Sequence, residues 1–235
     1  MCEAPPTAMS LQDAMEVVSR REVIFKILKW HLEELDDEMI IHISGMTKDD
    51  ETVYVKIPNY QPYVYLELPK RIEWTKERAR NVFMFLKTYM KGHGPVKYRL
   101  CDKFKLHYKV PGKYLMLVFN THGECRKLEY LLHYPIRING FTNFEAYEFA
   151  LHEQNIDPII KFTVNKKIKP SGWVKVIEME EYIEDREFST CDIDMYSSWD
   201  DVNPIDIPDT VTIHPKWVSF DIETSIRRAK ETGRI

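Results

Sequence analysis

Residues 63–92 read YVYLELPKRIEWTKERARNVFMFLKTYMKG, and this stretch decides the fold that we predict. Its first six residues alternate in polarity as a half-buried strand does, and Pro69 closes them because proline cannot donate to a sheet. Thr75 then suits the N-cap of a helix, apolar residues recur three or four positions apart, and Gly92 ends the run. The stretch therefore predicts a strand followed by an amphipathic helix.

A second cycle of the same kind follows along the chain. VKYRL (96–100) and KLHYKV (105–110) suggest a strand pair, KYLMLVF (113–119) a buried strand, and GECRKLEYLLHYP (123–135) a helix that a proline ends. This βαββαβ order is typical of a ferredoxin-like unit, also the RNA-recognition architecture, which we place at residues 62–142. One sheet face would then be free, with Tyr65, Tyr114 and Phe119 as candidates for stacking on bases. The alternative is that these aromatic side chains pack in a core or against another domain.

The remaining segments predict an α+β chain of two domains. Residues 1–21 form a mobile leader, and 22–177 form a β-rich domain that opens with three strands at 23–35, 40–47 and 52–58 joined by acidic turns. Two short helices are expected around Asp157-Pro158, followed by a strand in SGWVKVIEME. Residues 178–209 hold twelve acidic residues and one arginine, which indicates a solvated connector, and 210–235 begin the next domain.

Composition excludes several classes of protein. The chain has 44% hydrophobic and 30% charged residues and no run of 18 apolar residues, so it reads as globular rather than membrane-spanning. Its first residues lack the pattern of a signal peptide, and we expect an intracellular protein. The four cysteines and eight histidines are dispersed, and none has the spacing that metal sites usually show. The sequence thus predicts no histidine metal site.

Basic residues gather between positions 54 and 116, where fourteen stand against four acids. Such density can bind phosphates with little sequence preference and strong salt dependence. Together with the two tyrosines named above, it makes Tyr65, Lys97, Arg99, Lys113 and Tyr114 the candidate contacts to nucleic acid. The alternative is a solvated helix face, because charge clustering in sequence does not show that the cations share one surface.

The stretch WVSFDIET (217–224) places two carboxylates at the end of an apolar strand. Side chains alternate across a strand, so Asp221 and Glu223 point to one side while Phe220 and Ile222 point into a core. Neighbouring carboxylates repel each other unless a cation such as Mg²⁺ or Mn²⁺ neutralises them. By itself the pattern is more often a solvated edge strand, and no partner carboxylates from other strands are evident.

These residues resemble the N-terminal region of family B DNA polymerases, especially the delta-like enzymes of eukaryotes and large DNA viruses. FDIET (220–224) is similar to the first exonuclease motif of that family, and Tyr147-Glu148 and Gly172-Trp173 fall in the expected order. The resemblance implies a β-rich N-terminal domain with an RNA-recognition-like part, and the first strand of an RNase H-like exonuclease domain. It also implies that Asp221 and Glu223 are catalytic and bind Mg²⁺ or Mn²⁺ in the full-length enzyme, with no metal stably bound by the fragment.

Three hypotheses follow. The first is part of a DNA-directed DNA polymerase with a 3'-5' proofreading exonuclease, which scaffolds the enzyme, contacts template and is inactive alone. Its partners would be DNA template and primer, the remainder of the polymerase and a sliding clamp or processivity factor, in the nucleus or a viral replication compartment. The second is a stand-alone RNA-recognition-like module, and the third, a complete small nuclease, is disfavoured by the missing carboxylates.

Overall fold

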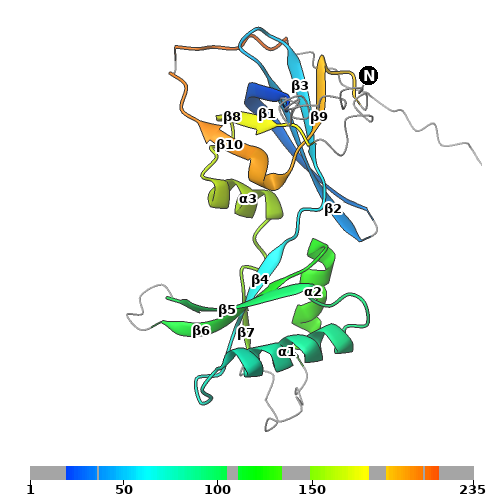
Figure 1. The fold of residues 1–235 in the computed structure, drawn as a ribbon, viewed down its shortest axis with the longest axis vertical. Helices are drawn as coiled ribbons and strands as arrows, with labels where there is room; N and C mark the ends of the chain where they lie inside the picture. The colour runs from blue at the N-terminus through cyan, green and yellow to red at the C-terminus, as the bar shows by residue number, and fades with distance from the viewer. Residues whose placement is uncertain are drawn as a thin grey trace, which may run out of the picture.

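The computed structural model describes residues 20–35, 37–104, 111–133, 149–179, 189–208 and 210–216. They form a mixed α+β arrangement in which two sheets lie one above the other (Figure 1). Residues 58–62 and 153–157 link the two sheets. This agrees with the α+β class predicted from the sequence. No helix among these residues has the length and apolar character needed to cross a membrane.

The first sheet has six strands in the order β10-β8-β1-β2-β3-β9. Only β3 and β9 pair in parallel, and every other neighbouring pair is antiparallel. The three expected strands at its start are confirmed as an antiparallel meander, and β1 begins at Glu22. The strands are β1 (Glu22–Leu35), β2 (Glu38–Met46), β3 (Thr52–Ile57), β8 (Trp173–Ile177), β9 (Ile193–Tyr196) and β10 (Val202–Ile205).

Alternating burial explains how this sheet forms its core. In β3, every second side chain is buried, as expected for a strand with one face covered. Helix α3 (Pro158–Lys166) covers that face and inserts Phe162, which is fully buried. Phe25 lies directly over Gly45, where an added Cβ would stand 2.2 Å from the ring, so the close approach of β1 and β2 requires glycine.

The second sheet has four antiparallel strands in the order β5-β6-β4-β7. Apolar residues of β4 and β6 share one buried cluster with residues of α1 and α2, so both helices cover the same face. Among the described residues, no helix packs along the opposite face, although α3 contacts it at Tyr63. The elements are β4 (Tyr63–Glu67), α1 (Lys76–Tyr89), β5 (Lys97–Lys103), β6 (Gly112–Val118), α2 (His122–Leu131) and β7 (Ala150–His152).

Both helices of this unit begin at threonines. The Thr75 side chain accepts from the backbone N–H of Arg78, which confirms the expected N-cap. Thr121 caps α2, and Glu124 completes a capping box by accepting from the Thr121 backbone N–H. Gly92, with φ of +91°, follows the end of α1 in a conformation that suits glycine.

One local expectation was wrong, and another falls partly outside the described residues. The strand at 97–103 pairs with β6, and the segment 105–110, expected to be its partner, lies outside the described residues. The first of the two helices expected around Asp157-Pro158 was wrong. Residues 150–152 instead form the short edge strand β7, which pairs with β4. The second helix is α3, and Asp157 caps it by accepting from the Ile159 N–H at 2.7 Å.

The solvated connector expected at 178–209 is also wrong for its later part. Strand β9 pairs with β3 and strand β10 pairs with β8, so these acidic residues form both edges of the six-stranded sheet. The acids are held by hydrogen bonds rather than by solvent alone: Asp192 accepts from both the backbone N–H and the hydroxyl of Thr52 at 2.7 Å. The domain limits themselves stay a prediction.

Candidate functional site

The free face of the four-stranded sheet carries aromatic and basic side chains. In β4, Val64 and Leu66 join the core below the sheet, so the alternate residues Tyr63 and Tyr65 lie on the free face. The two tyrosine rings meet edge to face at 5.5 Å. This geometry offers two aromatic side chains, side by side, on the face opposite to α1 and α2.

Three cations stand on β5, the edge strand that β6 separates from β4. Tyr98 and Leu100 of β5 pack against the core, which puts Lys97, Arg99 and Lys103 on the free face. The Lys103 ammonium sits 3.2 Å from the centroid of the Tyr65 ring, a cation–π contact. Basic side chains thus border the aromatic residues of this face.

The five predicted nucleic-acid contacts do not stay together. Tyr65, Lys97 and Arg99 share the free face, and Arg99 pairs across the ladder with Met116 beside Tyr65. Tyr114 is only 3% exposed and packs edge-on against His152, so its ring is not available for stacking. Lys113 turns to the opposite side, where its ammonium lies 2.7 Å from Asp102.

Phe119, the third aromatic candidate, is fully buried in the core between the sheet and α1 and α2. The core-packing alternative therefore holds for this residue. The basic belt is likewise divided, because Lys76, Arg78 and Lys87 belong to α1, on the other side of the sheet from Arg99. Sequence clustering had joined cations that the fold places on different surfaces.

A cavity of about 410 Å³ opens beside Tyr63 and Tyr65. Residues of β4, β5 and β6 line one side, and Asn165 of α3 and Trp199 of the 3-10 helix η3 (Trp199–Asp201) also line the cavity. Sequence reasoning missed Trp199, which lies within the acidic segment and is 44% exposed. The lining residues are Asn59, Tyr60, Gln61, Tyr63, Tyr65, Lys97, Met116, Val118, Asn165 and Trp199.

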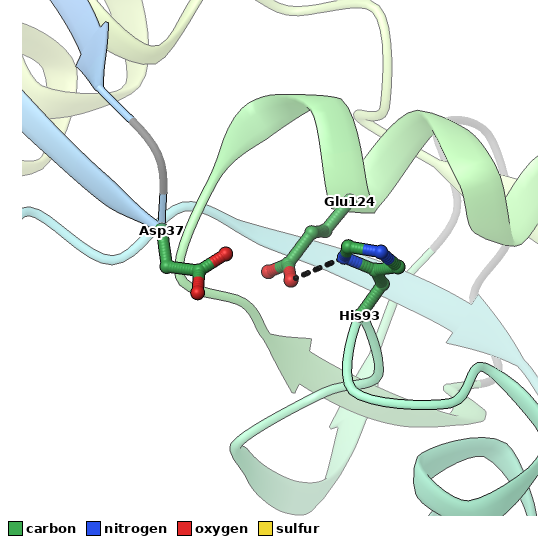
Figure 2. A group of neighbouring side chains, drawn as sticks. All are labelled: Asp37, His93 and Glu124. Carbon is green, nitrogen blue, oxygen red and sulfur yellow. Dashed lines mark ion pairs between the residues drawn. The ribbon is translucent and has the colours of Figure 1, made fainter.

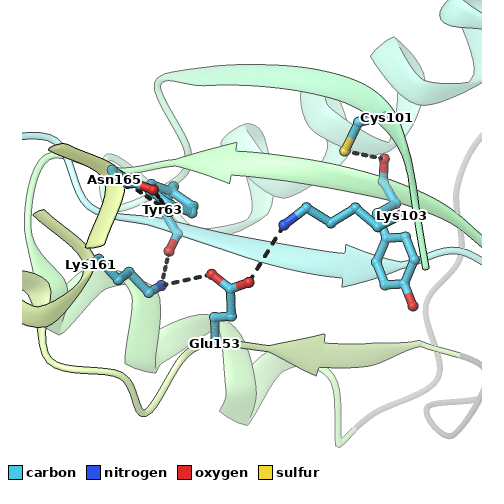
Figure 3. A network of polar contacts seen from close by, with 7 residues as sticks. Tyr63, Cys101, Lys103, Glu153, Lys161 and Asn165 are labelled. Atoms are coloured by element: carbon cyan, nitrogen blue, oxygen red, sulfur yellow. Dashed lines mark hydrogen bonds and ion pairs between the residues drawn. The ribbon is translucent and has the colours of Figure 1, made fainter. Parts of the chain in front are cut away.

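A polar network fixes this wall of the cavity (Figure 3). The buried Lys161 donates to the backbone oxygen of Tyr63, and Asn165 donates its amide to the Tyr63 hydroxyl at 3.0 Å. Glu153 stands between Lys161 and Lys103, with N···O distances of 3.9 and 3.5 Å. Burial lowers the pKa of Lys161 and raises the pKa of the Tyr63 hydroxyl. The hydrogen bond from Asn165 holds the Tyr63 side chain in one orientation.

The predicted exonuclease carboxylates, Asp221 and Glu223, lie outside the described residues, as does Tyr147-Glu148. Gly172-Trp173 is described at the start of β8, where the Gly172 carbonyl accepts from the Ile27 N–H at 3.0 Å. Trp173 is buried and pairs with β1 and β10. This pair therefore anchors the sheet.

Comparison with known proteins finds similar sequences and one similar structure. Residues 149–232 match the model of the DNA polymerase family B exonuclease domain. The DNA polymerase of Acanthamoeba polyphaga mimivirus is 27% identical over 226 residues, covering 87% of this chain and 13% of that protein. DNA polymerase 037L of Invertebrate iridescent virus 6 is 25% identical and covers 83% of this chain and 18% of its own length. The DNA polymerase delta catalytic subunit of Plasmodium falciparum is 22% identical, covering 78% and 18%.

A solved structure, that of the family B DNA polymerase from the hyperthermophilic archaeon Pyrobaculum calidifontis, aligns with 65% of this chain and 17% of its own, at 14% identity and a TM-score of 0.48.

The sequence matches show that this chain is similar to family B DNA polymerases, the family that FDIET resembles. More narrowly, its relatives include polymerases of large DNA viruses and a eukaryotic delta subunit, and the matches fit the N-terminal region of such an enzyme. The chain spans less than a fifth of the length of the three relatives named above. These findings favour the polymerase hypothesis over a stand-alone RNA-recognition-like module.

Proposed function

We propose that this chain works within a family B DNA-directed DNA polymerase that replicates DNA and proofreads through a 3'-5' exonuclease. The observation that carries the proposal is the match of residues 149–232 to the exonuclease domain, which includes Asp221 and Glu223. The six-stranded sheet is its framework, and the four-stranded unit contacts the template. Without the carboxylates that other parts of the polymerase supply, the chain alone is inactive.

Asp221 and Glu223 are the proposed ligands of two divalent cations. Oxygen donors suit Mg²⁺ and Mn²⁺, and a pair of such ions activates water and stabilises the leaving oxygen of a phosphodiester. Carboxylates two residues apart on a strand point to one side, so both can serve one metal centre. Phe220 and Ile222, on the other side, would hold the strand against a core.

The four-stranded unit is proposed to be ferredoxin-like. Read from its other edge, its strand order is β7-β4-β6-β5, with α1 and α2 on one face and all neighbours antiparallel, and this arrangement supports the assignment. Tyr63, Tyr65, Lys97 and Arg99 on the free face suit single-stranded nucleic acid, because tyrosines stack on bases and cations pair with phosphates. The proposed ligand is the template strand.

The proposed partners are DNA template and primer, the remainder of the polymerase, and a sliding clamp or processivity factor. Replication would take place in the nucleus or in a viral replication compartment. Support for these partners comes from the polymerase relatives, all of which are much longer than the aligned segment.

The proposal is tested in a full-length polymerase that contains this chain. Asp221→Ala and Glu223→Ala should each lower exonuclease activity by at least about 100-fold, because even residues that only support metal ligands cost roughly 10- to 100-fold. Primer extension with correctly paired primers should be retained. Asp206→Asn, a change at an exposed acid of the same segment, is the matched control and should leave both activities unchanged.

Retention of full exonuclease activity in both alanine variants would overturn the assignment. Mg²⁺-dependent digestion of DNA by the purified 235-residue chain would contradict the proposal that it is inactive alone and would revive the small-nuclease hypothesis.

A further inference from the structure

Three potential metal ligands from distant parts of the sequence meet where the two sheets approach each other (Figure 2). Asp37 lies in the turn between β1 and β2, His93 in the loop after α1, and Glu124 in the first turn of α2. Figure 2 shows the Glu124 carboxylate between the Asp37 carboxylate and the His93 ring. One ligand atom from each lies within 4.8 Å of those of the other two.

Glu124 is the most unusual of the three because it is a carboxylate only 3% exposed. One of its oxygens, Oε2, accepts from the backbone N–H groups of Asn120 and Thr121 at 3.1 and 3.3 Å. The other, Oε1, is buried, has no hydrogen-bond partner among the residues that the structure describes, and faces His93, with which it forms the ion pair drawn in Figure 2. A buried carboxylate oxygen without a donor is costly, which indicates that a ligand completes its surroundings.

The distances suit a small cation. Protein ligands roughly 2.0–2.2 Å from a tetrahedral ion lie about 3.4 Å from one another. His93 Nδ1 and Glu124 Oε1 are already 3.5 Å apart. Asp37 is exposed and in a turn, so a small adjustment of its side chain closes the remaining distance.

The charge of the surroundings also favours a cation. Glu34, near the end of β1, accepts from the Gly123 N–H at 3.2 Å, directly beside Glu124. Three carboxylates, from Glu34, Asp37 and Glu124, therefore gather around the start of α2. The partial positive charge of a helix N-terminus is about half an elementary charge, too small to balance them.

We propose that Asp37, His93 and Glu124 form a binding site for a divalent transition-metal ion, with Zn²⁺ as the best match. Two carboxylates and one imidazole suit Zn²⁺, whereas Mg²⁺ prefers oxygen ligands alone. The bound ion joins the β1–β2 hairpin of one sheet to the helical side of the other. The site uses neither Asp221 nor Glu223, and the inference does not rest on the proposed proofreading activity.

The test is calorimetric titration of Zn²⁺ into the 235-residue chain under reducing conditions. All proteins carry Asp221→Asn and Glu223→Gln, so that a failure here says nothing about the exonuclease proposal. The parent should bind Zn²⁺ at this site and resist competition by a large excess of Mg²⁺. His93→Ala and Asp37→Asn should each weaken that binding by at least about 10-fold and abolish the Zn²⁺-dependent rise in Tm.

Glu124→Gln separates metal binding from folding, because glutamine also completes a capping box. This variant should keep the Tm of the metal-free parent and lose Zn²⁺ affinity. His133→Ala, at an exposed histidine just beyond the C-terminal end of α2, is the matched control and should bind Zn²⁺ as the parent does. Equal Zn²⁺ affinity and stoichiometry in the parent and in His93→Ala would overturn the proposal.

Discussion

The two sheets of this chain are assembled in opposite ways. The six-stranded sheet joins segments far apart in sequence, since β1 pairs with β8 and β3 pairs with β9. The four-stranded sheet is drawn from one interval, 63–152, and α1 and α2 both cover the same face of it. The difference fits the two roles proposed above: the first sheet as a framework, and the second as a surface that presents Tyr65 and Arg99 to nucleic acid.

The largest effect should come from truncating the core of either sheet. Phe25 belongs to the six-stranded core and Phe119 to the four-stranded core, and both are fully buried. Phe25→Ala and Phe119→Ala should each cost about 3–5 kcal/mol of unfolding free energy, because each leaves a cavity. Hydrogen exchange should show the loss mainly in the sheet that carries the substitution, since the two apolar clusters are separate.

Val164→Ala is the control for this pair, because Val164 is 69% exposed and its truncation should change stability by less than about 0.5 kcal/mol. Equal loss of protection in both sheets after either phenylalanine substitution would show that the chain unfolds as one cooperative unit.

A smaller effect should separate the free face from the covered face. Tyr65→Ala should weaken binding of single-stranded DNA by about 1–3 kcal/mol, the usual loss when a stacking aromatic residue is removed. Arg99→Ala should reduce the salt dependence by about 0.7 in the slope of log K against log salt, as expected for one lost phosphate contact. Fluorescence anisotropy at several salt concentrations measures both quantities.

Lys113→Ala removes a cation of the same belt from the other face, so it should leave affinity and salt slope unchanged. If Lys113→Ala weakens binding as much as Arg99→Ala does, the free face is not the binding surface.

The smallest effect concerns pH and the six-stranded sheet. Burial lowers the pKa of His42 below about 6.5, against the opposing influence of Glu33, whose carboxylate lies 3.0 Å from His42 Nε2. A lowered pKa favours the neutral ring in the folded state. The contribution of neutral His42 to the free energy of unfolding is therefore complete above pH 6.5. It is lost as the pH falls from 6.5 toward the folded-state pKa.

Denaturant unfolding across this range should show a weaker pH dependence in His42→Gln than in the parent. His31→Gln, a change at the exposed neighbouring histidine, should keep the parental dependence. An unchanged profile in His42→Gln would assign the pH response to other groups, among them His122, whose pKa burial also lowers.

Local pattern predicted the elements well and their partners poorly. The first three strands, the Thr75 cap and the strand at 173–177 follow from periodicity and capping chemistry, which act over a few residues. The acidic segment was misjudged because charge outweighed its short apolar stretches. Met195 and Val202 in that segment are fully buried. A strand of only two or three alternating positions is too short for its sequence to predict this burial.

The candidate surface was predicted in part for the same reason. Once the strands are aligned, Tyr65, Lys97 and Arg99 lie on one face of the sheet. Lys113 pairs with Asp102 and faces the other way. Trp199 reaches the cavity only because η3 and β10 return to the first sheet.

The sequence by itself determined the α+β composition, the two capped helices and, through FDIET, the relation to family B DNA polymerases. These depend on residues close together in the chain, whose periodicity and chemistry a short window contains. Only the tertiary structure decided the parallel pairing of β3 with β9 and the meeting of Asp37, His93 and Glu124. Contacts between residues so far apart depend on how the whole chain packs, because no local preference specifies which distant segment will be the neighbour.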